Sequence, residues 1–152
     1  MKGYHNKPEE TEAAFVRVDD DPTPYFKTGD YVEMDQISGV YTIKGRLSSD
    51  IIKHKGYKVS ALDIENVLLA HSCISECAVV GVDHDTHGQS IAAVVVRSDV
   101  DSRSLVGLSD LQALCKDELA DYQTPQQVVF VDELPRNAMG KVNKKELVKQ
   151  LL

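Results

Sequence analysis

The stretch ECAVVGVDHDTHGQSIAAVVV, from Glu76 to Val96, places two apolar runs on either side of a polar loop. A short continuous apolar run that is bounded by turn-forming residues is typical of a strand with both faces buried. A strand with one face in water would instead alternate apolar and polar residues. This stretch therefore predicts two buried strands in the core of a folded domain.

Three helical patterns surround these strands in the sequence, and each follows a residue that can cap a helix. A Ser or Asn side chain before the first turn accepts a hydrogen bond from an exposed backbone N–H group of that turn. The predicted caps are Ser60, Ser109 and Asn143, and the helices are predicted over residues 61–70, 110–122 and 144–152. Apolar residues recur at helical spacing within them, so each helix is expected to pack one face against the core.

Shorter strand patterns complete the domain. Three alternating segments lie between glycine-bearing turns, and a fourth strand pattern precedes the last helix. They are YVEMD (31–35), GVYTIKGR (39–46), GYKVS (56–60) and QQVVFV (126–131). This order indicates an α+β domain over residues 47–152. The polar segment up to Asp30, with DDDPTP at Asp19 to Pro24, is predicted to be a turn-forming appendage.

Charge is distributed unevenly along the chain. The formal net charge of −7 argues against nucleic acid or an anionic membrane surface as a partner of the whole molecule. Ten of the 17 lysines and arginines nevertheless lie in two short windows. They are Lys44, Arg46, Lys53, Lys55 and Lys58, and Arg136, Lys141, Lys144, Lys145 and Lys149. Such clusters suit a small polyanion better than a nucleic acid duplex.

The chain has three cysteines, which are Cys73, Cys77 and Cys115. They show no CxxC spacing, so they indicate neither a disulfide framework nor a zinc ribbon, and a reducing compartment fits, either the cytoplasm or the mitochondrial matrix. His71, Cys73 and Cys77 have no obvious fourth ligand, and His84 and His87 lie in a polar loop. No metal site is therefore predicted, and no apolar run is long enough to span a membrane.

A first motif is YFKTGD, Tyr25 to Asp30, which places a carboxylate directly after a Thr-Gly turn. A carboxylate at such a turn can accept two hydrogen bonds from the cis-diol of a ribose. On this spacing alone, a solvated aspartate in a turn is the simpler interpretation.

A second motif is GRLSSDIIKHKGYKVSALDIE, which begins at Gly45. Arg46 is a planar cation with several donors, suited to ribose or phosphate oxygens. Lys53, Lys55 and Lys58 crowd around the Gly56 turn, where they repel one another unless an anion lies between them. A solvated basic hairpin is the alternative interpretation.

A third motif is PRNAMGKVNKKEL, Pro135 to Leu147. It is not a phosphate-binding P-loop, because Pro135 occupies the position of the first glycine and no Ser or Thr follows Lys141. What remains is a lysine on a Gly-containing loop between a strand and a capped helix, an arrangement that presents one cation to a partner site. The long lysine stem lets the charge reach a phosphate or carboxylate.

In this order and spacing, the three motifs closely resemble the C-terminal end of the acyl-adenylate-forming enzymes, which include acyl-CoA synthetases, luciferases and adenylation domains of nonribosomal peptide synthetases. The resemblance covers essentially the whole chain, since GYHNKPEETEAAF is similar to the segment before the Thr-Gly-Asp motif. Within the family, the malonyl-CoA synthetase group is the most similar. The implied fold is the small α+β C-terminal domain of these enzymes, a short β-hairpin plus a mixed sheet packed with about three helices.

The resemblance implies that residues 1–46 are the tail end of a large N-terminal AMP-binding domain and that residues 47–152 are the mobile C-terminal domain. Family members join a carboxylic acid to ATP, release pyrophosphate, and transfer the acyl group from AMP to CoA. ATP and Mg²⁺ bind mainly to the N-terminal domain, whose phosphate loop has no counterpart in this sequence, so this chain alone is expected to be inactive. The alternative is a free-standing nucleotide- or CoA-binding or regulatory module without catalysis.

By the same resemblance, Lys141 is the catalytic lysine that enters the active site for the first step. Asp30 is then the ligand of the ribose hydroxyls, and Arg46 contacts the ribose or a phosphate.

For the second step, the resemblance implies that the small domain rotates and withdraws the catalytic lysine. Gly56 and Lys58 then line the CoA tunnel, and Lys53 adds positive charge. The segment before Gly56 is one residue longer than in many members of the family, so the hinge falls on Ser48 or Ser49.

Overall fold

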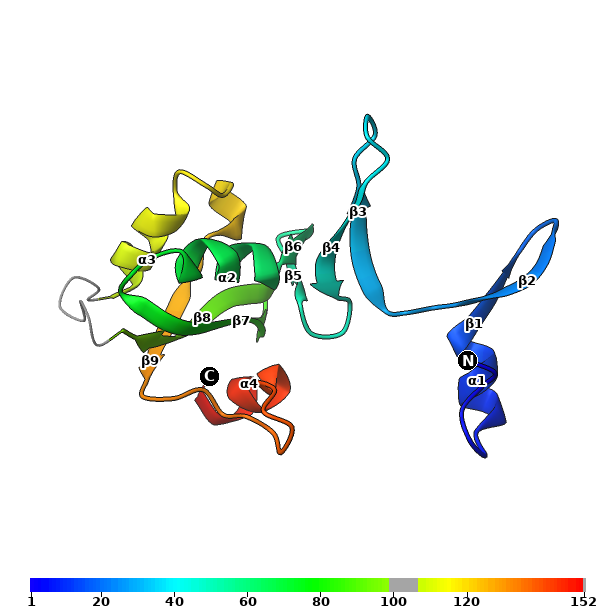
Figure 1. Ribbon diagram of the computed structural model, residues 1–152. Coiled ribbons are helices and arrows are strands. Elements are labelled where there is room, and N and C mark those ends of the chain that lie inside the picture. The colour runs from blue at the N-terminus through cyan, green and yellow to red at the C-terminus, as the bar shows by residue number, and fades with distance from the viewer. Residues whose placement is uncertain (99–106, 152) are drawn as a thin grey trace. The chain divides into compact units, whose positions relative to one another are not determined.

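The computed structural model of the protein describes residues 1–98 and 107–151 (Figure 1). The chain divides into two compact units, Met1–Asp30 and Tyr31–Leu152. The first unit contains helix α1 (Pro8–Ala14) and an antiparallel pair of strands, β1 (Phe15–Val18) and β2 (Asp21–Phe26). The rings of Phe15 and Phe26 close this pair with their centroids 5.5 Å apart.

The prediction of a turn-forming segment from Asp19 to Pro24 was wrong from Asp21 onward, because β2 begins there. Proline has no N–H group to donate to a strand ladder and is therefore confined to sheet edges. Here β2 pairs only with β1, and the register joins β1 to Asp21, Tyr25 and Phe26, so both prolines of β2 are tolerated.

The second unit contains the predicted α+β fold. Strands β3 (Asp30–Met34) and β4 (Tyr41–Arg46) form a two-stranded sheet. A five-stranded mixed sheet follows, made of β5 (Ile51–His54), β6 (Tyr57–Ser60), β7 (Ile74–His84), β8 (Gly88–Arg97) and β9 (Gln127–Val131). Its order is β6-β5-β8-β7, with β9 paired to β8; the β9 pairing is parallel and the others are antiparallel.

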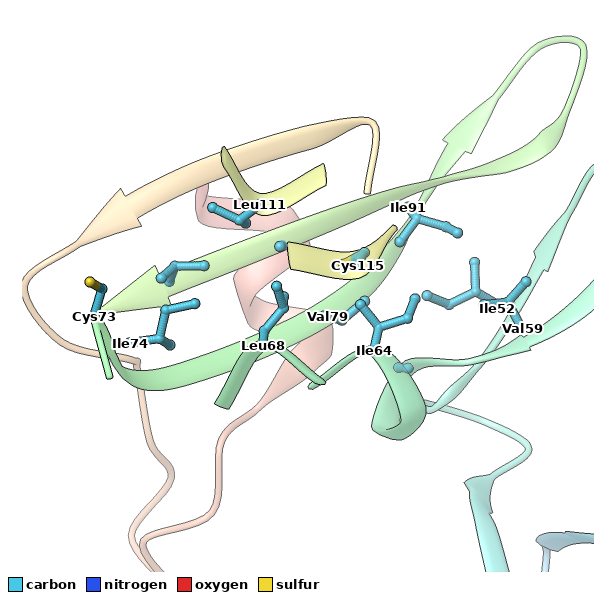
Figure 2. Packing of buried hydrophobic residues seen from close by; sticks show 13 residues of the cluster. Ile52, Val59, Ile64, Leu68, Cys73, Ile74, Val79, Ile91, Leu111 and Cys115 are labelled. Carbon is cyan, nitrogen blue, oxygen red and sulfur yellow. The ribbon is translucent and has the colours of Figure 1, made fainter. Parts of the chain in front are cut away.

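Helices cover both faces of this sheet (Figure 1). Helices α2 (Ala61–Leu69) and α3 (Leu108–Cys115) contribute Ile64, Leu68 and Leu111 to the core of one face, which Figure 2 shows together with Val79. On the other face, Leu147 of helix α4 (Lys144–Leu151) packs in one cluster with Ala78 and Val94. Successive strand residues therefore face two different cores, which explains the continuous apolar runs and confirms the two buried strands.

Two of the three predicted helix caps are confirmed. The amide of Asp63 donates a hydrogen bond of 3.1 Å to Ser60 Oγ, and the amide of Glu146 donates one of 3.4 Å to Asn143 Oδ1. The third cap was wrong, because α3 starts after Gly107 rather than after Ser109. There the Asp110 carboxylate accepts a 2.8 Å bond from the Gly107 amide, which fixes the start of the helix two residues earlier.

The second predicted helix was also too long. Helix α3 ends at Cys115, and a separate 3₁₀ turn, η1 (Asp121–Gln123), follows it. Leu111 and Cys115 are buried as expected, and Leu114 and Leu119 pack against the same core. The apolar spacing of residues 111–119 thus predicted the buried face correctly, although the backbone leaves the helix partway along it.

Candidate functional site

The turn that joins β5 to β6 projects a group of basic residues, and we refer to residues 51–60 as the glycine hairpin. Lys55 and Gly56 form its two-residue turn, with φ angles of 50° and 84°. Positive φ at both central positions matches the right-handed twist of the flanking strands, and glycine adopts it without strain.

Lys53 and Lys58 are directly opposite each other in the register of this hairpin, and both are exposed. Like charges at directly opposed positions destabilise a strand pair. Lys58 Nζ lies 5.3 Å from the centroid of the Tyr31 ring, a cation–π contact that offsets part of this repulsion. The hairpin thus concentrates positive charge at some expense of stability, as expected of a surface that binds an anion.

Lys141 lies in a closely bonded loop between β9 and α4, and we refer to residues 136–142 as the lysine loop. The Asn137 side-chain oxygen accepts 3.0 Å hydrogen bonds from the amides of Met139 and Lys141. The Asn137 amide donates to the Lys141 carbonyl oxygen at 2.9 Å, and Arg136 and Val142 form a bridge across the base of the loop. The backbone of Lys141 is therefore held firmly while its side chain is exposed.

Arg136 ties the lysine loop to the central sheet. Its Nη1 atom donates a 3.0 Å hydrogen bond to the Gly140 carbonyl oxygen, and its Nη2 atom forms an ion pair with Glu76 of β7. A planar guanidinium is well suited to holding two acceptors in a fixed geometry. Arg136 thus joins the lysine loop to β7 of the second unit.

The segment after β4 is a tight turn, and we refer to residues 46–50 as the serine turn. The Asp50 carboxylate accepts a 2.9 Å bond from the Arg46 amide, and the Asp50 amide donates a 2.8 Å bond to the Arg46 carbonyl oxygen. Ser48 and Ser49 lie inside this ring, and Arg46 is exposed at the end of β4. The two ends of the turn are therefore fixed to each other, with both predicted hinge serines between them.

Gly45 is required for this turn because its φ angle is +125° and a Cβ atom there would lie 2.5 Å from Asp50 Cβ. We expect Gly45→Ala to lower the free energy of unfolding by roughly 2–5 kcal/mol, the sum of backbone strain and overpacking. Gly39→Ala is the matched control, because Gly39 also has a positive φ of 71° but open space around its Cβ position. Urea unfolding should show a loss of only about 1 kcal/mol for that control, from backbone strain alone. Equal losses for the two variants would contradict the crowding between Gly45 and Asp50.

The structure brings the predicted residues of the second unit into two groups. Ser49 and Lys141 line one groove together with Asp50, Asn137 and Lys144. The Gly56 turn lies at the opposite end of β5 from the serine turn, and Lys58 lines a different groove with Tyr31 and Lys44. The lysine loop and the glycine hairpin therefore lie at separate places on the surface of the second unit.

Asp30 is the first residue of β3 and falls in the first unit, Met1–Asp30. Its amide donates a 3.2 Å hydrogen bond to Thr28 Oγ1, and Gly29 has a φ angle of 79°; residues 27–29 belong to no helix, strand or assigned turn. Its role as a ribose ligand stays a prediction.

Comparison with known families identifies this arrangement. The model of the family described as the AMP-binding enzyme C-terminal domain matches residues 63–141, just over half of the chain. The chain belongs to this family.

Individual relatives match the AMP-binding C-terminal domain and the segment before it. A mitochondrial malonate–CoA ligase of Homo sapiens is 47% identical over 98% of this chain and 24% of its own length. The crystal structure of ATP-bound MatB from Rhodopseudomonas palustris has a TM-score of 0.80 and 35% identity, and covers 97% of this chain and 27% of that one. The o-succinylbenzoate CoA synthetase of Bacillus subtilis, in complex with its acyl-adenylate intermediate, has a TM-score of 0.81 and 31% identity over 97% of this chain and 28% of that one. This chain therefore spans about a quarter of the length of the curated relatives it matches.

Sequence reasoning missed one group of residues in this AMP-binding C-terminal domain. Lys144 Nζ lies 2.8 Å from Asp50 Oδ1 and 2.8 Å from Glu65 Oε1, so one lysine pairs with two carboxylates. Burial by itself raises the pKa of Asp50. The hydrogen bonds from Lys144 and from the Arg46 amide, with the positive charge of Lys144, outweigh this effect, so the pKa lies below its usual value. Lys144 and Asp50 are 94 residues apart in the sequence, which left no local pattern that could have indicated the pair.

The cysteines of the domain are structural rather than reactive. Cys73, Cys77 and Cys115 are free thiols. Burial raises the pKa of Cys77 to about 12 and that of Cys115 to about 11, so both remain protonated at neutral pH.

Within residues 1–98 and 107–151, no group of three or more histidine, cysteine or acidic side chains could hold a metal ion. None of the helices in this part of the chain is long and apolar enough to cross a membrane.

Proposed function

We propose that this chain is the C-terminal part of an acid–thiol ligase that activates a carboxylic acid, with malonate as the favoured substrate, and transfers the acyl group to CoA. The supporting observation is the lysine loop, which fixes the backbone of Lys141 on both sides and leaves its amino group exposed. A lysine on a rigid base is suited to meeting charge that develops in a partner site.

In the first half-reaction a carboxylate oxygen of the acid attacks the α-phosphorus of ATP, the bond to the β-phosphate oxygen breaks, and pyrophosphate leaves. Lys141 is proposed to stabilise the negative charge shared by the reacting carboxylate and the α-phosphate. Asp30 is proposed to accept hydrogen bonds from the ribose hydroxyls, and Arg46 to contact the ribose or a phosphate. Mg²⁺ would accompany ATP and be held mainly by the N-terminal domain.

In the second half-reaction the CoA sulfur, after losing its proton, attacks the acyl carbon, and the C–O bond to AMP breaks. Gly56 and Lys58 are proposed to line the path of CoA, with Lys53 adding positive charge toward its phosphates. The unfavourable Lys53–Lys58 pairing supports this role, because a bound polyanion would neutralise the repulsion.

We place the division between the two moving parts at residues 46 and 47, with Ser48 or Ser49 as the hinge. Several contacts across this division would have to break during rotation: the Arg46–Asp50 hydrogen bonds of the serine turn, the Lys58–Tyr31 contact, and those of Lys44 in β4. Lys44 Nζ lies 3.2 Å from Asp63 Oδ2, and Ser60 Oγ donates a 2.7 Å bond to the Lys44 carbonyl oxygen. Lys44 and Asp63 are only 24% and 32% exposed and Ser60 is buried, so these contacts favour the orientation seen here, and rotation about a few residues would have to release them.

The non-catalytic alternative is not favoured, because the relatives that match this chain along nearly its whole length are ligases. The free thiols and the mitochondrial location of a relative support a reducing compartment, the cytoplasm or the mitochondrial matrix.

The test uses the full-length protein that contains this chain. Carboxylate-dependent exchange of labelled pyrophosphate into ATP, measured with malonate, acetate, succinate and o-succinylbenzoate, should be fastest with malonate, and CoA should then yield malonyl-CoA. Fast exchange with another acid would reject malonate and retain the ligase. Absence of exchange with every acid would reject the ligase itself.

A further inference from the structure

Lys144 holds three segments of the second unit together. Its ammonium group lies between Asp50 at the end of the serine turn and Glu65 in α2, while Lys144 itself is the first residue of α4. The side chains of the three residues are only 15%, 14% and 12% exposed. Charges removed from water to this extent are costly unless their hydrogen bonds are well satisfied.

Both carboxylates are also fastened to backbone groups. Asp50 accepts from the Arg46 amide, and its carbonyl oxygen accepts a 2.7 Å bond from the Ala61 amide at the start of α2. Glu65 accepts a 2.7 Å bond from the Val79 amide in the central sheet. Lys144 is thus connected to fixed points rather than to mobile side chains.

The same lysine stands three residues after Lys141. The short segment between them is held by the Asn143 amide, which donates a 3.4 Å bond to the Pro135 carbonyl oxygen. Movement of the start of α4 must therefore move the lysine loop, and the groove that contains Lys141 also contains Ser49, Asp50 and Lys144.

We propose that Lys144 is a positioning residue for the adenylation step: it fastens the lysine loop to the fixed end of the serine turn, so that rotation at the hinge delivers Lys141 to the reacting groups in one defined place. This inference rests on the proposed ligase function. Lys144 touches neither substrate nor reacting atoms in this account, and its effect is confined to the half-reaction that uses Lys141.

The test compares both half-reactions in the full-length protein. Lys144→Met should slow malonate-dependent pyrophosphate exchange ~10- to 100-fold, the loss expected when a reacting group is misplaced by about 1 Å. Thioester formation from preformed malonyl-adenylate should stay within about twofold of wild type. Lys144→Arg, which keeps the charge and both contacts, should restore most of the exchange. Lys149→Met, at an exposed position on the same helix, is the matched control and should leave both half-reactions unchanged.

A second variant guards against simple misfolding. Lys144→Met leaves two carboxylates without their cation, whereas Asp50→Asn, Glu65→Gln and Lys144→Met combined replace the cluster with neutral groups that still accept from the Arg46 and Val79 amides. The combined variant should regain the melting temperature of wild type but remain slow in pyrophosphate exchange alone. Wild-type exchange in the combined variant, or parallel loss of both half-reactions in it, would overturn the positioning role.

Two outcomes separate failure of the proposed ligase from failure of the role of Lys144. An inactive wild-type protein would reject the proposed ligase. An active wild type, with Lys144→Met as active as Lys149→Met, would reject only the role of Lys144.

Discussion

Replacing Lys141 with alanine in the full-length protein should lower carboxylate-dependent pyrophosphate exchange by at least ~100-fold, the scale of removing one preorganised charge from a transition state. The backbone of the lysine loop is held by Asn137 and by the Arg136–Val142 bridge, so loss of the exposed Lys141 side chain should not disturb the loop. Thioester formation from preformed acyl-adenylate should continue at close to the wild-type rate. The measurement is a pair of half-reaction assays on the same preparation.

The control for Lys141→Ala is Lys149→Ala, which removes another exposed lysine, from α4. It should change neither half-reaction, because only the lysine loop is proposed to meet the reacting groups. Equal loss of both half-reactions in Lys141→Ala would contradict its assignment to the first step.

The opposite pattern is expected for Gly56→Leu. A leucine at this position adds a side chain to the tip of the glycine hairpin, where no atom lies within 4 Å of the Cβ position and where CoA is proposed to pass. Transfer of the acyl group to CoA should therefore slow roughly 100-fold or more, the scale of a displaced reactant, while pyrophosphate exchange is retained. Initial rates of malonyl-CoA formation from preformed malonyl-adenylate measure the effect.

Backbone strain has to be separated from obstruction in this variant, because the φ angle of Gly56 is 84° and leucine there costs about 1–2 kcal/mol. Gly39→Leu bears a similar strain at a φ of 71°, also in open space, outside the glycine hairpin. The two variants should lose similar stability, and only Gly56→Leu should lose acyl transfer. Unimpaired transfer in Gly56→Leu would show that the hairpin does not face CoA.

Local hydrogen bonds and burial made much of the fold predictable. The cap residues Ser60 and Asn143 act within three residues of themselves, and the runs around Val79 and Val94 indicate burial on both faces directly. One error came from competition between neighbours. Asp110 accepts from the Gly107 amide and so displaces the start of α3 from Ser109, which no propensity of Ser109 alone reveals.

The candidate site was predictable only as separate motifs. Lys141 and Gly56 each stand in a local pattern that the structure places on a loop and a hairpin, respectively. The cluster of Lys144, Asp50 and Glu65 depends on tertiary packing that joins α4 to the serine turn and α2. A charge pair of this kind leaves no signature along the sequence, because nothing in the local pattern distinguishes this lysine from the other lysines around it.

The proposed alternation of the two half-reactions depends on rotation of residues 47–152 against the rest of the protein, and a distance within this chain measures that rotation. Bio-orthogonal labels at the exposed positions Glu9 and Lys149 of the full-length protein lie on opposite sides of the proposed division. With spin labels at these two positions, pulsed electron paramagnetic resonance should give one label-to-label distance with ATP and a non-reactive analogue of malonate. It should give a clearly different distance with an adenylate analogue and CoA. A single distance distribution that no ligand changes would contradict the alternation of Lys141 and the glycine hairpin at one site.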